Sequence, residues 1–224
     1  MAAWVFLALA LAPPAPETAP TLTLVWHDST RQFPAAGLGR LAEEVEALFR
    51  ENGLSVTFHA AAEHENLRLI PEPRVNAIVL PGESGRFGVP PNTMAAAHGE
   101  KGGKYSIFVF YPGVRRTLGH RDGQTSPRHL AELTRALARI VAHEVVHVLA
   151  PESGHAESGL MSGRLTREEL LGDVIDLDGP SLERAASAMK EWGSATGSSK
   201  FPIPAAPLRS IVGPEVQPPW PFVR

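Results

Sequence analysis

The segment from Ser126 to Leu149 constrains the fold most strongly, because its apolar residues recur at every third or fourth position and it stops at Ala150-Pro151. This spacing predicts one long amphipathic helix that the proline terminates. His143 and His147 lie four residues apart near its end, so both imidazoles lie on one face together with Glu144. The segment therefore predicts a helix that is half core and half metal site. Its apolar positions are Leu130, Leu133, Leu137, Ile140 and Val141.

A third ligand can come from the residues that follow this helix. Ser153-Gly154 supplies a turn before His155, so the chain can fold back toward the first two histidines. A carboxylate is the alternative, since Glu168 and Glu169 begin the next predicted helix. Thr166, three positions before Glu169, also fits a helix capping box, which would use that carboxylate locally. Both choices of third ligand stay open at this point.

The block from His143 to Met161 resembles the zincin metallopeptidases and, more narrowly, the metzincins, in which a third histidine and a methionine-containing turn follow the helix. The resemblance implies that His143, His147 and His155 are the ligands of one catalytic Zn²⁺ ion. It also implies that Glu144 is the general base and that Met161 lies beneath the site.

Two features depart from the usual metzincin pattern. The loop between His147 and His155 is two residues longer, and Ala150-Pro151 stands where a glycine usually ends the helix. The resemblance covers this block closely, and the order of the elements before it only loosely.

These residue types suit the hydrolysis of an amide bond. Three neutral imidazoles would hold one zinc ion and leave a fourth position for water, whose pKa then falls to about 7. Glu144, next to His143, can accept the proton of that water as general base. We therefore expect a zinc-dependent metalloendopeptidase that acts on peptide or protein substrates through a metal-activated water. The alternatives are a non-catalytic binding protein on a zincin scaffold and a zinc hydrolase for a non-peptide amide.

Hydrophobic residues make up 43% of the 224 positions, enough for one sizeable core. We expect an α+β fold of zincin type over residues 21–192, with a twisted mixed β-sheet packed on helices and a small, mostly helical C-terminal part. Residues 87–104 predict a long loop, and the resemblance makes Tyr105–Phe110 the edge strand that pairs with substrate. Strands are predicted at 21–28, 55–58, 74–80 and 105–111, and helices at 37–52, 126–149, 165–171 and 182–192.

The ends of the chain and its charge bear on location and partners. Residues 2–12 are apolar but too few to span a bilayer, so we interpret residues 1–20 as a signal-peptide-like segment with a proline-rich linker. This predicts a secreted or periplasmic protein. Residues 193–224 are rich in Ser, Gly and Pro and predict a flexible tail. A net charge of −3 offers no general attraction to nucleic acid, and no membrane span is predicted.

Overall fold

The structure, a computed structural model, describes residues 20–63, 65–70, 72–100, 104–121, 126–194 and 209–212. The signal-peptide-like segment therefore lies outside the described residues except for its last position, and so does most of the predicted tail. Within these ranges no helix is both long enough and apolar enough to cross a bilayer. The secreted or periplasmic location stays a prediction.

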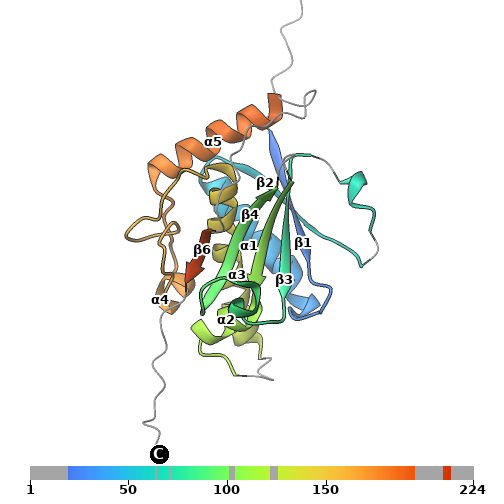
Figure 1. Cartoon of the computed structure of the whole chain (residues 1–224), viewed down its shortest axis with the longest axis vertical. Helices are drawn as coiled ribbons and strands as arrows, with labels where there is room; N and C mark the ends of the chain where they lie inside the picture. Colours follow the sequence, from blue (N-terminus) through green and yellow to red (C-terminus); the bar gives the residue numbers. More distant parts are fainter. Residues whose placement is uncertain are drawn as a thin grey trace, which may run out of the picture.

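A mixed β-sheet forms the centre of the described chain and has six strands in the order β2-β1-β3-β5-β4-β6 (Figure 1). The first four strands in this order are parallel, whereas β4 is antiparallel to β5 and β6 is antiparallel to β4. The strands are β1 (Thr21–His27), β2 (Ser55–Ala60), β3 (Arg74–Leu80), β4 (Thr93–Glu100), β5 (Lys104–Phe110) and β6 (Arg209–Val212).

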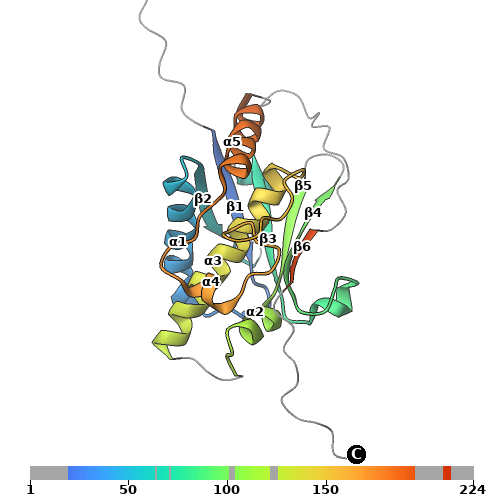
Figure 2. The same ribbon diagram turned by 90° about the vertical axis from the view of Figure 1, so that its left-hand side faces the viewer.

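Two helices, α1 and α3, lie side by side and cover one face of this sheet (Figure 2). Leu41, Val45 and Phe49 are buried at helical spacing, so one side of α1 packs into the main core. The opposite face of the sheet carries a smaller apolar cluster around Val89 and Phe110. The helices are α1 (Leu38–Glu51), α2 (Tyr111–Thr117), α3 (Pro127–Leu149), α4 (Arg167–Leu171) and α5 (Gly179–Ser194), with short 3₁₀ turns at 35–37, 67–69 and 84–87.

The predicted helix at 126–149 is confirmed as α3. The Ser126 hydroxyl accepts a hydrogen bond from the N–H of His129, and Pro127 occupies the first helical position, so the start of the helix is defined locally. Every residue of α3 from Ala136 to Leu149 is buried. An amphipathic pattern predicts one exposed side, but α1 and the sheet cover part of this helix while α4 and α5 pack on the rest. The predicted site half of α3 is therefore enclosed by protein.

Two predictions about the cleft side of the sheet are wrong. Residues 87–104 are not one long loop, because Thr93–Glu100 forms β4. Tyr105–Phe110 does not form the sheet edge, because β5 lies between β3 and β4. The β4 sequence, with three successive alanines from Ala95, has a weak intrinsic preference for strand. It becomes a strand through antiparallel pairing with β5, a tertiary effect that outweighs local preference.

The prediction for the tail is wrong at residues 209–212, which form β6. This strand pairs with β4 at Ala97↔Arg209, Ala96↔Ser210 and Ala95↔Ile211 and ends the sheet on that side. It also packs against α3, and both ribbon views show it beside β4 at the edge of the sheet (Figures 1 and 2). Four residues carry no detectable periodicity, so this strand depends on the backbone groups that β4 offers.

Candidate metal centre

The helix α3 presents two imidazoles in adjacent turns. The rings of His143 and His147 have centroids 4.6 Å apart and are nearly perpendicular, with an interplanar angle of 76°. Both residues are buried, with exposed fractions of 0% and 3%. The four-residue spacing therefore gives the common face that the sequence predicts, in an enclosed part of the molecule.

The chain turns back directly after α3 and brings a third imidazole to the same place. The N–H of Ser153 donates a hydrogen bond to the carbonyl oxygen of Ala150 at 2.8 Å, which closes a tight turn. The ring centroid of His155 then lies 5.4 Å from that of His143 and 5.0 Å from that of His147. His155 is exposed, unlike the other two. The longer loop therefore does not prevent the third histidine from reaching the first two.

A glycine leaves room for the ring of His155. A Cβ atom added at Gly163 would lie 3.0 Å from both Cγ and Nδ1 of His155, closer than side chains normally pack. The loop between them is closed by a hydrogen bond of 2.8 Å from the N–H of Ala156 to the carbonyl oxygen of Met161. Small residues and backbone hydrogen bonds together therefore fix where His155 lies.

The three histidines could hold a metal ion. One ring nitrogen from each lies within 4.8 Å of the other two. Among the described residues, these three are the His, Cys, Asp or Glu side chains found close enough together to share one metal ion. Nitrogen ligands about 2.0–2.1 Å from a tetrahedral zinc ion are themselves about 3.3 Å apart, so the cluster has the right scale. Nε2 of His143 is buried and has no hydrogen-bond partner among the described residues. This nitrogen is suited to bind a metal ion, because a buried polar atom without any partner lowers the stability of the folded state.

The protonation state of His143 suits this role. Its Nδ1 lies 2.6 Å from the carbonyl oxygen of Leu160 and must carry the proton of this hydrogen bond, so Nε2 keeps its lone pair. Burial lowers the pKa of His143 well below its ordinary value, and the neighbouring His147 and His155 lower it further. The Leu160 carbonyl opposes this effect. His143 is thus neutral at physiological pH, the form that binds metals.

Leu160 is itself fixed on its other side. Its N–H donates to the carbonyl oxygen of Asp176 at 2.8 Å, and its side chain is buried. Gly159 has a φ of +80°, and a Cβ there would lie 2.6 Å from the Asp176 oxygen, so only glycine allows this approach. The chain thus holds the acceptor for His143 between two hydrogen bonds.

Glu144 lies within the same buried stretch of α3. Its exposed fraction is 0%, and its neighbours in sequence and at the next turn are His143 and His147. A carboxylate in such an enclosed position is costly unless positive charge compensates it, which a cation held by the three histidines would do. The burial of Glu144 and the histidine cluster are thus consistent with each other.

The alternative carboxylate ligands lie elsewhere. Glu169 forms the predicted capping box: its side chain accepts the N–H of Thr166 at 2.8 Å, and the Thr166 hydroxyl accepts the N–H of Glu169. Among the described residues, neither Glu168 nor Glu169 belongs to the histidine group. The structure therefore favours His155 over a glutamate as the third residue.

Met161 is buried in the main core, with an exposed fraction of 1%. Its backbone carbonyl closes the loop that carries His155. The prediction that its side chain lies beneath the metal site stays a prediction.

The sequence did not indicate three further residues at the site: Leu160 and Asp176, which contribute backbone hydrogen bonds, and Gly163, which leaves space for the ring of His155. Gly159, which precedes Leu160, is a local signal for a tight turn at this place, whereas no local signal indicates Asp176 or Gly163.

Comparison with known proteins gives distant similarities only. No protein-family model and no curated protein matches the chain. A zinc-dependent peptidase from Methanocorpusculum labreanum (strain Z) has 13% identity and a TM-score of 0.44, over 73% of this chain and 99% of its own. An archaemetzincin from Methanopyrus kandleri has 14% identity and a TM-score of 0.45, over 79% of this chain and 99% of its own.

Proposed function

We propose that this protein is a zinc-dependent metallopeptidase. The main support is the position of three ring nitrogens, one each from His143, His147 and His155, within 4.8 Å of one another. The first two of these residues lie on α3, the helix that also contains Glu144. Three neutral imidazoles and no thiolate, in a chain without cysteine, favour zinc over metals that prefer oxygen ligands. In this proposal the three histidines are the ligands of one ion, Glu144 is the general base, and Met161 packs beneath the site.

When bound, zinc supplies Lewis acidity that polarises a carbonyl group and lowers the pKa of water to about 7. The protein residues do the rest. The hydrogen bond from Nδ1 of His143 to Leu160 leaves the lone pair on Nε2, so His143 would bind the ion without a change of tautomer. Glu144 accepts a proton from water and returns it to the leaving amine, so it acts as base and then as acid. The products are a carboxylic acid and an amine.

The proposed substrates are peptides or proteins, cleaved internally. An extended chain can pair with the edge of a β-sheet through its backbone, which tolerates many side chains. On the side of the sheet nearest α3 the relevant strands are β4 and β6, in place of the predicted Tyr105–Phe110. Endopeptidase rather than exopeptidase activity belongs to the proposal, because it follows from the resemblance of the block at 143–161.

A second candidate is a protein that keeps this scaffold and its metal but has no turnover. The burial of Glu144, with no exposed surface, favours it, because a substrate cannot reach a fully enclosed base. A hydrolase for a non-peptide amide would use the same residues and differs only in substrate.

One experiment separates these candidates. The purified full chain is analysed for bound metal and incubated with unstructured casein, with and without a chelator, beside Glu144→Gln as the matched control. We expect one zinc per chain, cleavage that the chelator stops, and no cleavage by the variant. Bound zinc without cleavage of casein or of any peptide in a mixed library would support the non-catalytic candidate. Absence of stoichiometric metal would overturn both.

A further inference from the structure

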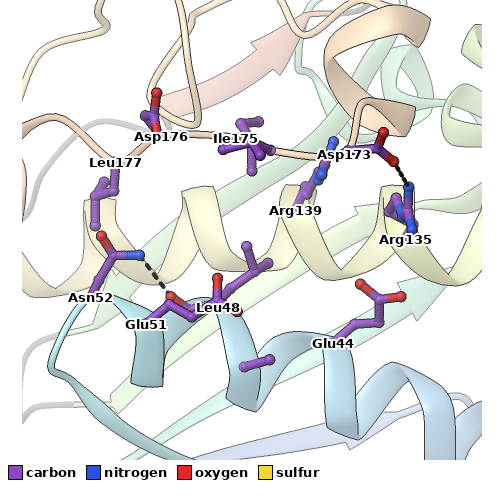
Figure 3. Close-up of a pocket in the computed structure, with 12 residues that line it drawn as sticks. Glu44, Leu48, Glu51, Asn52, Arg135, Arg139, Asp173, Ile175, Asp176 and Leu177 are labelled. Carbon is purple, nitrogen blue, oxygen red and sulfur yellow. Dashed lines mark hydrogen bonds and ion pairs between the residues drawn. The ribbon is translucent and has the colours of Figure 1, made fainter.

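Arg139 lies one helical turn before His143 and is buried, with an exposed fraction of 4%. Its guanidinium donates Nη1–H to the carbonyl oxygen of Glu169 at 2.5 Å and Nη2–H to that of Gly172 at 2.6 Å. Figure 3 shows Arg139 and Arg135 extending from α3 toward the segment that carries Asp173 and Asp176. Arg139 therefore holds the C-terminal end of α4 through backbone carbonyls.

The segment 172–178 is tied to α3 a second time, through the metal site. Its Asp176 carbonyl accepts the N–H of Leu160, and the Leu160 carbonyl accepts the proton of His143 Nδ1. Arg139 and His143 are four residues apart on one helix, so the same helix holds both ends of this hydrogen-bonded connection. A shift of the segment 172–178 would move the acceptor of His143.

A buried guanidinium is a costly way to attach a short helix. Removing such an ion from water costs several kcal/mol, and an apolar side chain of similar volume often packs at least as well. Burial, and then the nearby Arg135, lower the pKa of Arg139, while Glu44 and Asp173 oppose this effect. What an apolar residue cannot do is fix two carbonyl groups in defined positions.

We propose that Arg139 is a positioning residue for the metal ligand His143. By fixing the segment 172–178, it holds the Leu160 carbonyl where that group sets the tautomer and orientation of the imidazole. This inference rests on the proposed metal site. Loss of a direct hydrogen-bond partner of a metal ligand, here the Leu160 carbonyl, changes metal affinity by about 10–100-fold, and loss of Arg139 would act through this partner.

The test compares Arg139→Leu and Arg139→Lys with Arg128→Leu, a control on the same helix whose side chain is 84% exposed. Zinc affinity is measured by competition with a chelator, and stability by unfolding of the metal-free chain. We expect Arg139→Leu to lose about tenfold or more in zinc affinity, Arg139→Lys to lose less, and Arg128→Leu to lose nothing. Unchanged zinc affinity in Arg139→Leu, whatever its stability, overturns the inference.

Nitrogen NMR of the metal-free chain gives a readout that is independent of zinc and of activity. The wild type is expected to show His143 protonated at Nδ1, and the Arg139 variants a mixture of tautomers. If Arg139→Leu does not fold, Arg139→Lys carries the same comparison, and an unmixed Nδ1 tautomer there contradicts the inference. If the wild type binds no zinc, the proposed function fails, while the tautomer measurement still decides the role of Arg139.

A different observation supports a second inference about the C-terminal strand. β6 pairs antiparallel with β4 and packs against α3, the helix of the histidine cluster (Figure 1). In this same form His143, Glu144 and His147 have exposed fractions of 0%, 0% and 3%. The edge of β4 that an extended peptide would use is thus already paired with β6.

We infer that β6 is an internal competitor for the strand position that an extended peptide would take along β4. The inference rests on the proposed function. A strand of four residues makes few hydrogen bonds, but tethering gives it a high effective concentration, so an external peptide has to displace it. A peptide could then pair with β4 only after β6 has left that strand.

Single prolines in the full chain test this inference, since proline cannot donate to a strand. Adjacent N–H groups of a strand face opposite sides, so one of Ser210→Pro and Ile211→Pro removes a hydrogen bond that β6 donates to β4. The controls Ser210→Ala and Ile211→Val keep the amide. We expect one proline variant to cleave a quenched peptide with kcat/KM raised about tenfold or more, and a peptide of residues 207–214 added in trans to reverse the gain.

Hydrogen exchange of the β4 amides at residues 95–97 reports displacement directly. Faster exchange with unchanged kcat/KM overturns the inference. If zinc-loaded wild type and variants all cleave nothing, the proposed function fails. The inference about β6 is then tested by binding of the labelled 207–214 peptide to a proline variant that also carries Glu144→Gln. Binding to this variant, and not to the chain with Glu144→Gln alone, supports the inference. Equal binding to the two overturns it.

Discussion

The Nδ1 atom of His143 lies 2.6 Å from the carbonyl oxygen of Leu160, a residue seventeen positions further along the chain. This contact joins the end of α3 to the loop that carries His155. It leaves Nε2 as the atom that can bind a metal, so a backbone carbonyl determines which of the two ring nitrogens is available as a ligand. The proposed centre therefore depends on the path of the loop as much as on the spacing of the histidines.

Glu144→Gln tests the general base. The amide cannot accept a proton from water, so we expect kcat to fall by about 10²–10⁴-fold while one zinc stays bound. Turnover and zinc content are measured on the same preparation. Activity close to wild type would remove Glu144 from the mechanism.

His155→Ala and Glu169→Ala distinguish the two possible third ligands. Loss of a ligand should cost more than the 10–100-fold of an outer partner, so we expect zinc affinity to fall at least about 100-fold in His155→Ala. Glu169→Ala should keep zinc affinity and lose about 1 kcal/mol of stability with its capping box. Chelator competition and urea unfolding give the two quantities. The reverse pattern would assign the ligand role to the glutamate.

Gly163→Ala tests the space that the ring of His155 occupies. Its new methyl group would lie 3.0 Å from the imidazole, so the ring has to move and zinc affinity should fall about tenfold. Gly154→Ala is the matched control, because a Cβ there meets no atom within 4 Å. Equal zinc affinities in the two variants would show that His155 does not need this position.

Glu132 makes stability depend on acid pH. Hydrogen bonds from His120 and then from Arg128 and Arg167 lower its pKa from the ordinary 4.5 to about 2, while burial opposes them. A carboxyl whose pKa is lower in the folded state stabilises it above pH 4.5, and this stabilisation disappears as the pH falls toward 2. Glu132→Gln should therefore be less stable by about 1 kcal/mol at pH 7 and equal to wild type near pH 2. Urea unfolding at both pH values checks this, and a difference that does not shrink in acid contradicts it.

Removal of the metal should lower thermal stability. A ligand present at about 1,000 times its dissociation constant adds about 4 kcal/mol to the folded state, so Tm should fall on chelation and recover with added zinc. The triple change of His143, His147 and His155 to alanine is the control, since its Tm should not respond to zinc. A response in that variant would place the metal elsewhere.

Local sequence signals predicted much of this fold. The helix at 126–149 and the strand at 74–80 match the structure because hydrophobic periodicity, a serine cap and a terminating proline act within a few residues. The strand at Thr93–Glu100 was missed because its alanine-rich sequence carries no such signal, and pairing with β5 creates it. The same holds for β6, a strand of four residues that exists only against β4.

The sequence by itself determined which residues could form the centre, because helical geometry places His143, Glu144 and His147 within one turn whatever the rest of the chain does. Only the tertiary structure decided that His155 joins them, that Leu160 selects the nitrogen of His143, and that β6 pairs with β4. These relationships join residues far apart in the sequence. They depend on where separate segments pack, which no local pattern of side chains encodes.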